Sequence, residues 1–246
     1  MEALNTLHEW QGSAYAGGTG GAFAPDAGVT GVTSSGGVAP LVTRCVDCHV
    51  PLGANGVADH SMVGGNVYMA SEITNDPSMT ASVTANLQSA IGLEAKRVGD
   101  AVDVTVRNRG AGHAFPTGVT DIREPWVELD AVDAQGNLVA VYGGAAADGT
   151  IPLDAARFGM DIATANGQLL YLHELSKSTR IPYALFVPPL GSVDVLIDAP
   201  STLPAGADHL DAVLYYHNIR TPYFRAATGS GTATAPQVEV ARVTVQ

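Results

Sequence analysis

The feature that most constrains this chain is the pentapeptide Cys45-Val46-Asp47-Cys48-His49. Cys-x-x-Cys-His is the attachment sequence of a c-type haem. The two thiols form thioethers with the vinyl groups of the porphyrin, and the adjacent imidazole becomes an axial ligand of the iron. The chain has 2 cysteines and both lie in this motif, so no thiol is left for a disulfide. We therefore expect one covalent haem c, attached through Cys45 and Cys48, with His49 as the first ligand of its iron.

Two other chemistries use a Cys-x-x-Cys pair, and the sequence favours neither. A thioredoxin-like redox pair opens a helix inside a βαβ unit, and no such pattern surrounds residues 45–48. A zinc site needs two further ligands with their own short spacing, such as a second Cys-x-x-Cys pair, and the sequence has none. Haem attachment is the interpretation that these residues favour.

Length and charge set the class of protein. The chain has 246 residues, of which 46% are hydrophobic, so it can form a substantial core. Its formal net charge of -12 argues against binding to nucleic acid or to an anionic membrane surface. No long apolar run is present, so we expect no membrane span.

The expected location follows from the haem. The first residues of the chain lack the basic and apolar regions of a signal peptide. Covalent haem attachment normally occurs outside the bacterial cytoplasm. We therefore expect a periplasmic or extracellular protein whose export signal has been removed.

The first part of the chain is expected to be rich in loops, with little helix. Residues 1–20 predict at most a short helix, and residues 17–40 have the Gly, Ala, Ser and Thr composition of a long loop. Asp76-Pro77 predicts the start of a helix, with the aspartate as N-cap. Apolar residues at helical spacing extend this helix over about 77–91, with Gly92 as its stop. The apolar positions are Val83, Leu87, Ala90 and Ile91.

From about residue 100 the hydrophobic period changes to two, which is typical of half-buried β-strands. Val102, Val104 and Val106 alternate with polar residues, and the turn at Gln135-Gly136-Asn137 predicts a hairpin. Its two strands lie near residues 127–131 and 138–142. Further predicted strands are 169–175, 183–187, 192–198, 210–217 and 238–245, the last with a bulge at Ala241-Arg242.

Consecutive strands without interleaved helices favour an antiparallel β-sandwich. The expected fold class is therefore mainly β. A loop-rich and partly helical haem-binding segment would occupy residues 1–95, and an antiparallel β-sandwich domain would occupy residues 96–246.

Three stretches of the chain carry a resemblance to a known group of proteins. They are Trp10–Ala16, Cys45–Pro51 with Asp59-His60 and Gly64-Gly65-Asn66, and Asn108–Gly118 followed by Arg123 and Trp126. These stretches resemble those of multihaem c-type cytochromes of the cytochrome c554/c-prime type, especially members with a β-sandwich after the haem region. The resemblance implies electron transfer between closely spaced haems.

The chain departs from this group in two ways. It has one haem motif instead of several, and Tyr15 stands where the group has a histidine. A member with one haem would have to pass its electrons to other subunits, or do something else.

The sequence leaves the second axial ligand of the iron open. His60 is the first candidate, because a glycine-bearing loop of eleven residues beyond His49 can pass round a haem edge and the resemblance implies a ligand there. His113 is the second candidate, because its Gly-His-x-x-Pro-Thr-Gly setting restricts the backbone. His8 is a further alternative.

Other side chains have less specific expectations. A methionine ligand would raise the reduction potential of the haem. Tyr15 is expected first as a packing residue, with haem ligation or a hydrogen bond to a bound molecule as alternatives, and Tyr15 and Met62 are candidates for the haem pocket. The candidate methionines are Met62, Met69 and Met79. The remaining histidines, His173, His209 and His217, are expected to be ordinary residues of the sandwich, and Asp121 is expected to be solvated.

The expected function is electron transfer by a c-type cytochrome with one haem, whose iron has two histidine ligands. Its partner would be a redox protein or other cytochrome subunits, in a homo-oligomer, a filament or another complex, and not nucleic acid. No nucleophile elbow, P-loop or dinucleotide fingerprint indicates an enzyme. Two alternatives stay open: a haem enzyme or gas-sensing module with an open distal site, and a structural or assembly subunit of a cytochrome complex.

Overall fold

The computed structural model describes residues 6–13, 15, 32–34, 44–50, 52 and 55–246. Most of the loop expected over residues 17–40 lies outside this part of the chain. The helices are α1 (Thr6–Gly12), α2 (Cys45–His49), α3 (Pro77–Ala90) and α4 (Thr221–Thr228), with a π-helical turn η2 (Met69–Ile73) and a 3-10 turn η3 (Leu175–Lys177). Within the described residues, none of the helices is long and apolar enough to cross a membrane.

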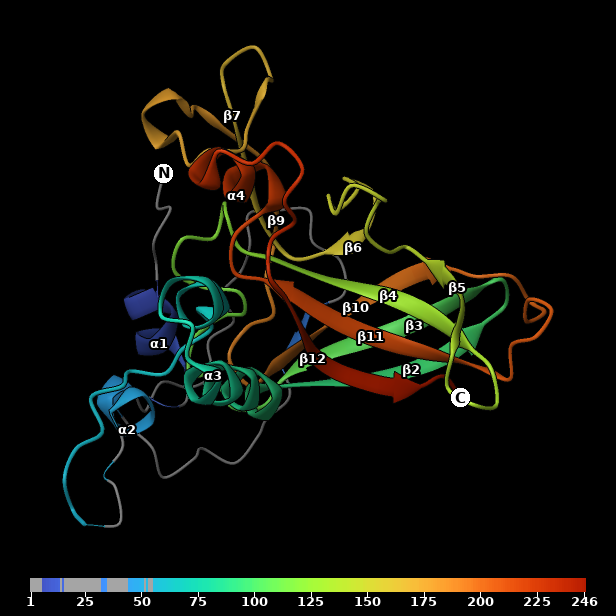
Figure 1. Ribbon diagram of the computed structural model, residues 1–246, viewed down its shortest axis with the longest axis horizontal. Coiled ribbons are helices and arrows are strands. Elements are labelled where there is room, and N and C mark those ends of the chain that lie inside the picture. Colours follow the sequence, from blue (N-terminus) through green and yellow to red (C-terminus); the bar gives the residue numbers. More distant parts are fainter. Residues whose placement is uncertain (1–5, 14, 16–31, 35–43, 51, 53–54) are drawn as a thin grey trace.

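Two antiparallel sheets form the body of the molecule (Figure 1). The first has the strand order β1-β10-β3-β2, with β1 (Val32–Ser34), β10 (Gly191–Asp198), β3 (Ala101–Asn108) and β2 (Ile91–Val98). The second has the order β12-β11-β4-β5, with β12 (Gln237–Thr244), β11 (His209–His217), β4 (Glu124–Val132) and β5 (Leu138–Tyr142), and β6 (Ala156–Arg157) pairs with β4. A small third sheet contains β8 (Leu169–Leu170), β7 (Gly159–Ala163) and β9 (Arg180–Leu185). The mainly β fold class is confirmed.

Alternating side chains build the core between the two large sheets. Val102, Val104 and Val106 of β3 are fully buried, as their period of two predicts. They belong to one hydrophobic cluster with residues of the opposite sheet, including Val127 and Leu129 of β4. Burial of each such side chain contributes about 1.5–3 kcal/mol to folding.

The predicted hairpin and the predicted bulge are both present. Strands β4 and β5 pair through a turn in which Asp133 N donates a hydrogen bond to Asn137 O at 2.9 Å. In the pairing of β11 with β12, the register moves from Ala241 directly to Glu239. The extra residue is therefore Val240, just before the position that the sequence pattern indicates.

Helix α3 begins as predicted but ends differently. The carboxylate of Asp76 accepts hydrogen bonds from Ser78 N at 2.9 Å and Met79 N at 3.2 Å, which caps the helix. Gly92 is not its stop, because the helix ends at Ala90 and the chain enters β2 directly. A Cβ atom at Gly92 would lie 2.9 Å from the guanidinium of Arg109, so the glycine makes room for that side chain.

The strand expected over residues 169–175 is much shorter, because only Leu169 and Leu170 pair with β7. His173 then adopts a left-handed backbone with φ 58°. Its Nδ1 lies 2.9 Å from the carboxylate of Asp121, which is buried at 1% exposure. The expectation that Asp121 is solvated is therefore wrong: this contact holds it inside the protein.

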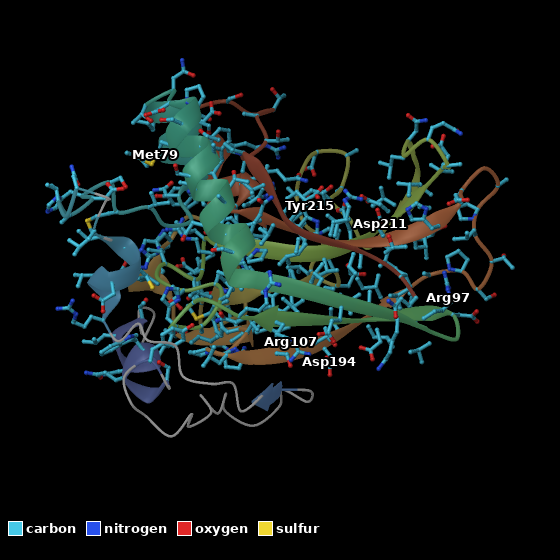
Figure 2. All side chains as sticks on the ribbon, turned by 90° about the horizontal axis from the view of Figure 1, so that it is seen from below. Met79, Arg97, Arg107, Asp194, Asp211 and Tyr215 are labelled. Atoms are coloured by element: carbon cyan, nitrogen blue, oxygen red, sulfur yellow. The ribbon has the colours of Figure 1, made fainter. Side chains whose placement is uncertain are left out.

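The helical segment and the sandwich share one core. Val67 and Leu87 belong to the same hydrophobic cluster as the valines of β3. Figure 2 shows α3 lying over the sandwich, with Met79 near its N-terminal end and Arg97 at the far end of the β2–β3 hairpin. The boundary expected between residues 95 and 96 falls inside β2, which pairs with β3 from Ile91 to Val98. The division into two domains stays a prediction.

Replacement of Leu87 tests this shared core. Leu87 is 6% exposed and Leu196, on β10, is 65% exposed. We expect Leu87→Ala to lower the free energy of unfolding by about 2–5 kcal/mol, because it leaves a cavity. The matched variant Leu196→Ala should change it by less than about 0.5 kcal/mol. Urea unfolding followed by circular dichroism measures both, and equal effects would contradict the shared core.

Candidate haem-binding site

The motif Cys45–His49 forms the single turn of helix α2. Its start is fixed by Arg44 and Asp47: Arg44 N donates to Asp47 Oδ2 at 3.0 Å, and Asp47 N donates to Arg44 O at 3.0 Å. Cys45 and Cys48 are three residues apart, which places them on the same side of the turn. Both are exposed and neither forms a disulfide. The two thiols are therefore presented together by a capped turn.

The electrostatics of Cys48 bear on whether Cys45 and Cys48 form a redox-active pair. Partial desolvation of the sulfur, and then the charge of Asp47, raise the pKa of the Cys48 thiol. A redox-active pair needs a readily formed thiolate, which comes from a lowered pKa. The surroundings of Cys48 thus argue against a redox-active pair.

The ring of His49 is oriented by one backbone carbonyl. Its Nδ1 lies 3.0 Å from Val63 O. Because a carbonyl oxygen only accepts, Nδ1 carries the proton and Nε2 keeps its lone pair. Histidines that bind metals usually donate their second N–H in this way. A Cβ at the nearby Gly65 would lie 3.2 Å from the Tyr216 hydroxyl and 3.3 Å from Leu87, so this segment packs closely on the core.

His113 has the same arrangement. Its Nδ1 lies 2.9 Å from Ala114 O, which leaves the lone pair on Nε2. Burial holds the pKa of His113 below its usual value, so the ring is neutral at neutral pH and can act as a ligand. The rings of His49 and His113 are nearly parallel, with an angle of 11° between their planes and 6.4 Å between their centres.

This spacing fits a metal ion held between the two rings. The ring centres are 6.4 Å apart, a distance at which parallel rings are offset and not directly superposed. Two metal–imidazole bonds of about 2.0–2.1 Å in line, with roughly 1.1 Å from each nitrogen to its ring centre, give about 6.3 Å between ring centres. With the Nε2 atoms directed at each other, His49 and His113 could therefore hold a haem iron between them.

The loop that carries His113 is anchored on both sides. Asn108 Nδ2 donates to His113 O at 2.8 Å, and Ala111 N donates to Asn108 Oδ1 at 3.0 Å. Phe115 and Val187 exchange two backbone hydrogen bonds of 2.8 Å. The imidazole is thus held by the sandwich itself.

Helix α1 closes the same loop from outside. One oxygen of Glu9 accepts from Ala114 N at 3.1 Å and from the Thr117 hydroxyl at 2.8 Å. The hydroxyls of Thr6 and Thr117 lie 2.7 Å apart. No sequence pattern identified Glu9, because its partners lie more than a hundred residues away in the chain.

Tyr15 lies between α1 and the haem motif. A Cβ at Gly112 would meet Trp10 at 3.1 Å and Tyr15 at 3.2 Å, so both aromatic rings pack against this glycine. Tyr15 is 5% exposed. Burial, and then the neighbouring Cys48 sulfur, raise the pKa of Tyr15, which indicates a hydroxyl near that sulfur. This location is consistent with a residue of the haem pocket.

The other candidate ligands lie elsewhere. His60 is exposed in a turn whose Asp59 carboxylate accepts from Ser61 N at 2.9 Å. His8 is exposed on α1. Met62 is 65% exposed and Met69 45% exposed, whereas Met79 packs against the core. The structure thus brings His113, the second candidate, to His49 and leaves His60 at the surface.

Comparison with known proteins bears on the fold. No family model and no curated protein matches this sequence. The structure is similar to that of a penta-heme cytochrome c552 from Thermochromatium tepidum, with a TM-score of 0.57 and 23% sequence identity. The match covers 81% of this chain and 46% of that one, so this chain spans just under half its length. At this identity the comparison shows a shared fold.

Replacement of Glu9 tests the anchoring of the His113 loop. Glu9→Ala leaves Ala114 N–H and the Thr117 hydroxyl without their acceptor, so we expect the free energy of unfolding to fall by about 1–3 kcal/mol. Gln11→Ala, at an exposed position of the same helix, is the matched control and should have little effect. Urea unfolding of the haem-loaded protein measures both. Equal stability of the two variants would show that α1 does not hold the loop.

Proposed function

We propose that this chain is an electron-transfer c-type cytochrome. One haem c is attached to Cys45 and Cys48, and its iron is held between His49 and His113. The bound haem supplies one-electron chemistry by alternating between the ferric and ferrous states. The observation that carries the proposal is the parallel pair of imidazoles, 6.4 Å between centres, directly beside the attachment motif.

The hydrogen bonds of the two histidines support this assignment. Each Nδ1 faces a backbone carbonyl, at 3.0 Å for His49 and 2.9 Å for His113. Both rings are thereby fixed in the tautomer that offers Nε2 to a metal. Neither ring has to change its tautomer to serve as a ligand.

Two histidine ligands favour electron transfer over catalysis. With both axial positions filled, no site is left for oxygen, peroxide or a signalling gas. Bis-histidine ligation favours a lower potential than a Met/His pair, because a methionine ligand raises the potential. The anchored loop after β3 would hold His113 in the same place in both oxidation states.

A partner protein is part of this proposal. A chain with one haem has to receive and pass its electrons through other proteins. The fold is shared with a multihaem cytochrome of about twice the length, which supports a haem-containing partner. Apolar side chains next to the motif, Val46 at 48% and Leu52 at 74% exposure, offer a surface for the haem and such a partner. We place the protein in the periplasm or outside the cell, because haem attachment occurs there.

Two histidine variants decide the axial ligand. We expect haem-loaded His113→Ala to become high-spin and to bind carbon monoxide in the ferrous state, because one axial position is vacated. His60→Ala is the matched control, because His60 is exposed, and should stay low-spin. Optical and electron paramagnetic resonance spectra distinguish the two. A high-spin His60→Ala together with a low-spin His113→Ala would assign the ligand to His60 instead.

Covalent attachment of the haem can be tested separately, by the mass and the absorption spectrum of the protein. Protein made in cells with a haem-ligation system should gain the mass of one haem. Cys45→Ala combined with Cys48→Ala should remove both that mass and the Soret band. A wild-type protein that has only its polypeptide mass would contradict the proposal.

A further inference from the structure

A cavity of about 580 Å³ lies apart from the haem-binding site. Its walls come from η2, from α4, from residues 145–149 and from residues 233–237. Figure 1 shows α4 next to β7 and β9, whereas α1 and α2 lie at a different corner of the molecule. The volume is within the range of small-molecule sites, about 300–1,000 Å³. None of its lining residues belongs to the haem-binding site.

His217 is the most constrained side chain of this cavity. It lines the cavity although its side chain is 3% exposed. Its Nδ1 lies 3.6 Å from Glu124 Oε2, and both atoms are buried without a hydrogen bond among the described residues. The ring packs against Trp126, with 4.7 Å between ring centres. The negative charge of Glu124 beside Nδ1 favours the tautomer that has its proton on Nδ1 and its lone pair on Nε2.

The charges behind His217 are balanced. Glu124 lies 3.6 Å from Arg220 Nε, and Asp161 accepts from Arg220 at 2.8 Å and from Arg157 at 2.6 Å. All four side chains are buried. Two arginines and two carboxylates leave no net charge at this end, so the buried charges behind the cavity favour neither an anion nor a cation.

The residues that line the cavity themselves favour a cation. Glu72 is the charged residue among those that line it, and neither lysine nor arginine is among them. Arg225 of α4 donates instead to Ala233 O at 3.0 Å and to Asp148 O. Phe224 supplies an aromatic side chain to the lining. The carboxylate of Glu72 and the lone pair of His217 both accept hydrogen bonds.

We propose that this cavity binds a small organic ammonium compound. Its N–H groups would donate to Glu72 and to His217 Nε2, and its apolar part would contact Ala145 and Phe224. A metal ion is a poorer occupant, because the described residues contain no group of three or more His, Cys, Asp or Glu that could hold one. The site is independent of the haem chemistry proposed above.

Calorimetric titration of the haem-loaded protein with n-butylammonium chloride tests the proposal. Sodium butyrate is the matched probe, because it has a similar apolar chain and the opposite charge. We expect saturable binding of one butylammonium per chain and no binding of butyrate. Absence of saturable butylammonium binding, or equal binding of butyrate, would overturn the proposal.

Two variants locate the binding. Glu72 and Ala145 are exposed, so replacing them should leave the fold intact. Glu72→Gln should weaken butylammonium binding about tenfold, since a charge-assisted hydrogen bond is lost. Ala145→Leu should abolish binding by filling the space. Glu94→Gln on β2 is the control and should bind as the wild type does; if Glu72→Gln and Ala145→Leu also do, the compound binds elsewhere and the proposal fails.

Discussion

The position of His113 depends on hydrogen bonds that join its loop to three separate parts of the chain. Asn108 belongs to the end of β3, Val187 to the connection between β9 and β10, and Glu9 to α1. These parts meet when the sandwich is folded. Ligation of an iron by His113, as proposed above, would therefore be coupled to folding of the whole molecule, and a bound haem would stabilise the folded state in return.

The fold was predictable where one local signal decides the structure. The alternating valines of β3 and the Asp76-Pro77 start of α3 are each recognisable from a few consecutive residues, and the structure contains both the strand and the helix start. The prediction that Gly92 ends the helix was wrong, because a glycine after an apolar helix resembles a C-cap. Its actual role, room for the side chain of Arg109, depends on a strand pairing that no local window contains.

The candidate haem-binding site also combines residues that a local sequence pattern reveals with one that only the fold brings near. Cys45, Cys48 and His49 lie in one pentapeptide, so their shared chemistry is visible in the sequence. The second histidine is brought close by the β2–β3 hairpin, which pairs Asn108 with Ile91 and so returns the chain to the end of α3. Gly110 N then donates to Ala90 O at 3.1 Å. Distance along the chain favoured His60, but the hairpin makes the more remote residue the neighbour.

Strand β11 contributes side chains next to the candidate haem-binding site and to the cavity lined by His217. The core-facing Tyr216 contacts the ring of Phe115 at 5.9 Å between centres and packs over Gly65, beside the segment that orients His49. The next residue, His217, points to the opposite face of the sheet and lines the cavity, because side chains alternate along a strand. One strand end thus supports the haem-binding site with one face and the cavity with the other.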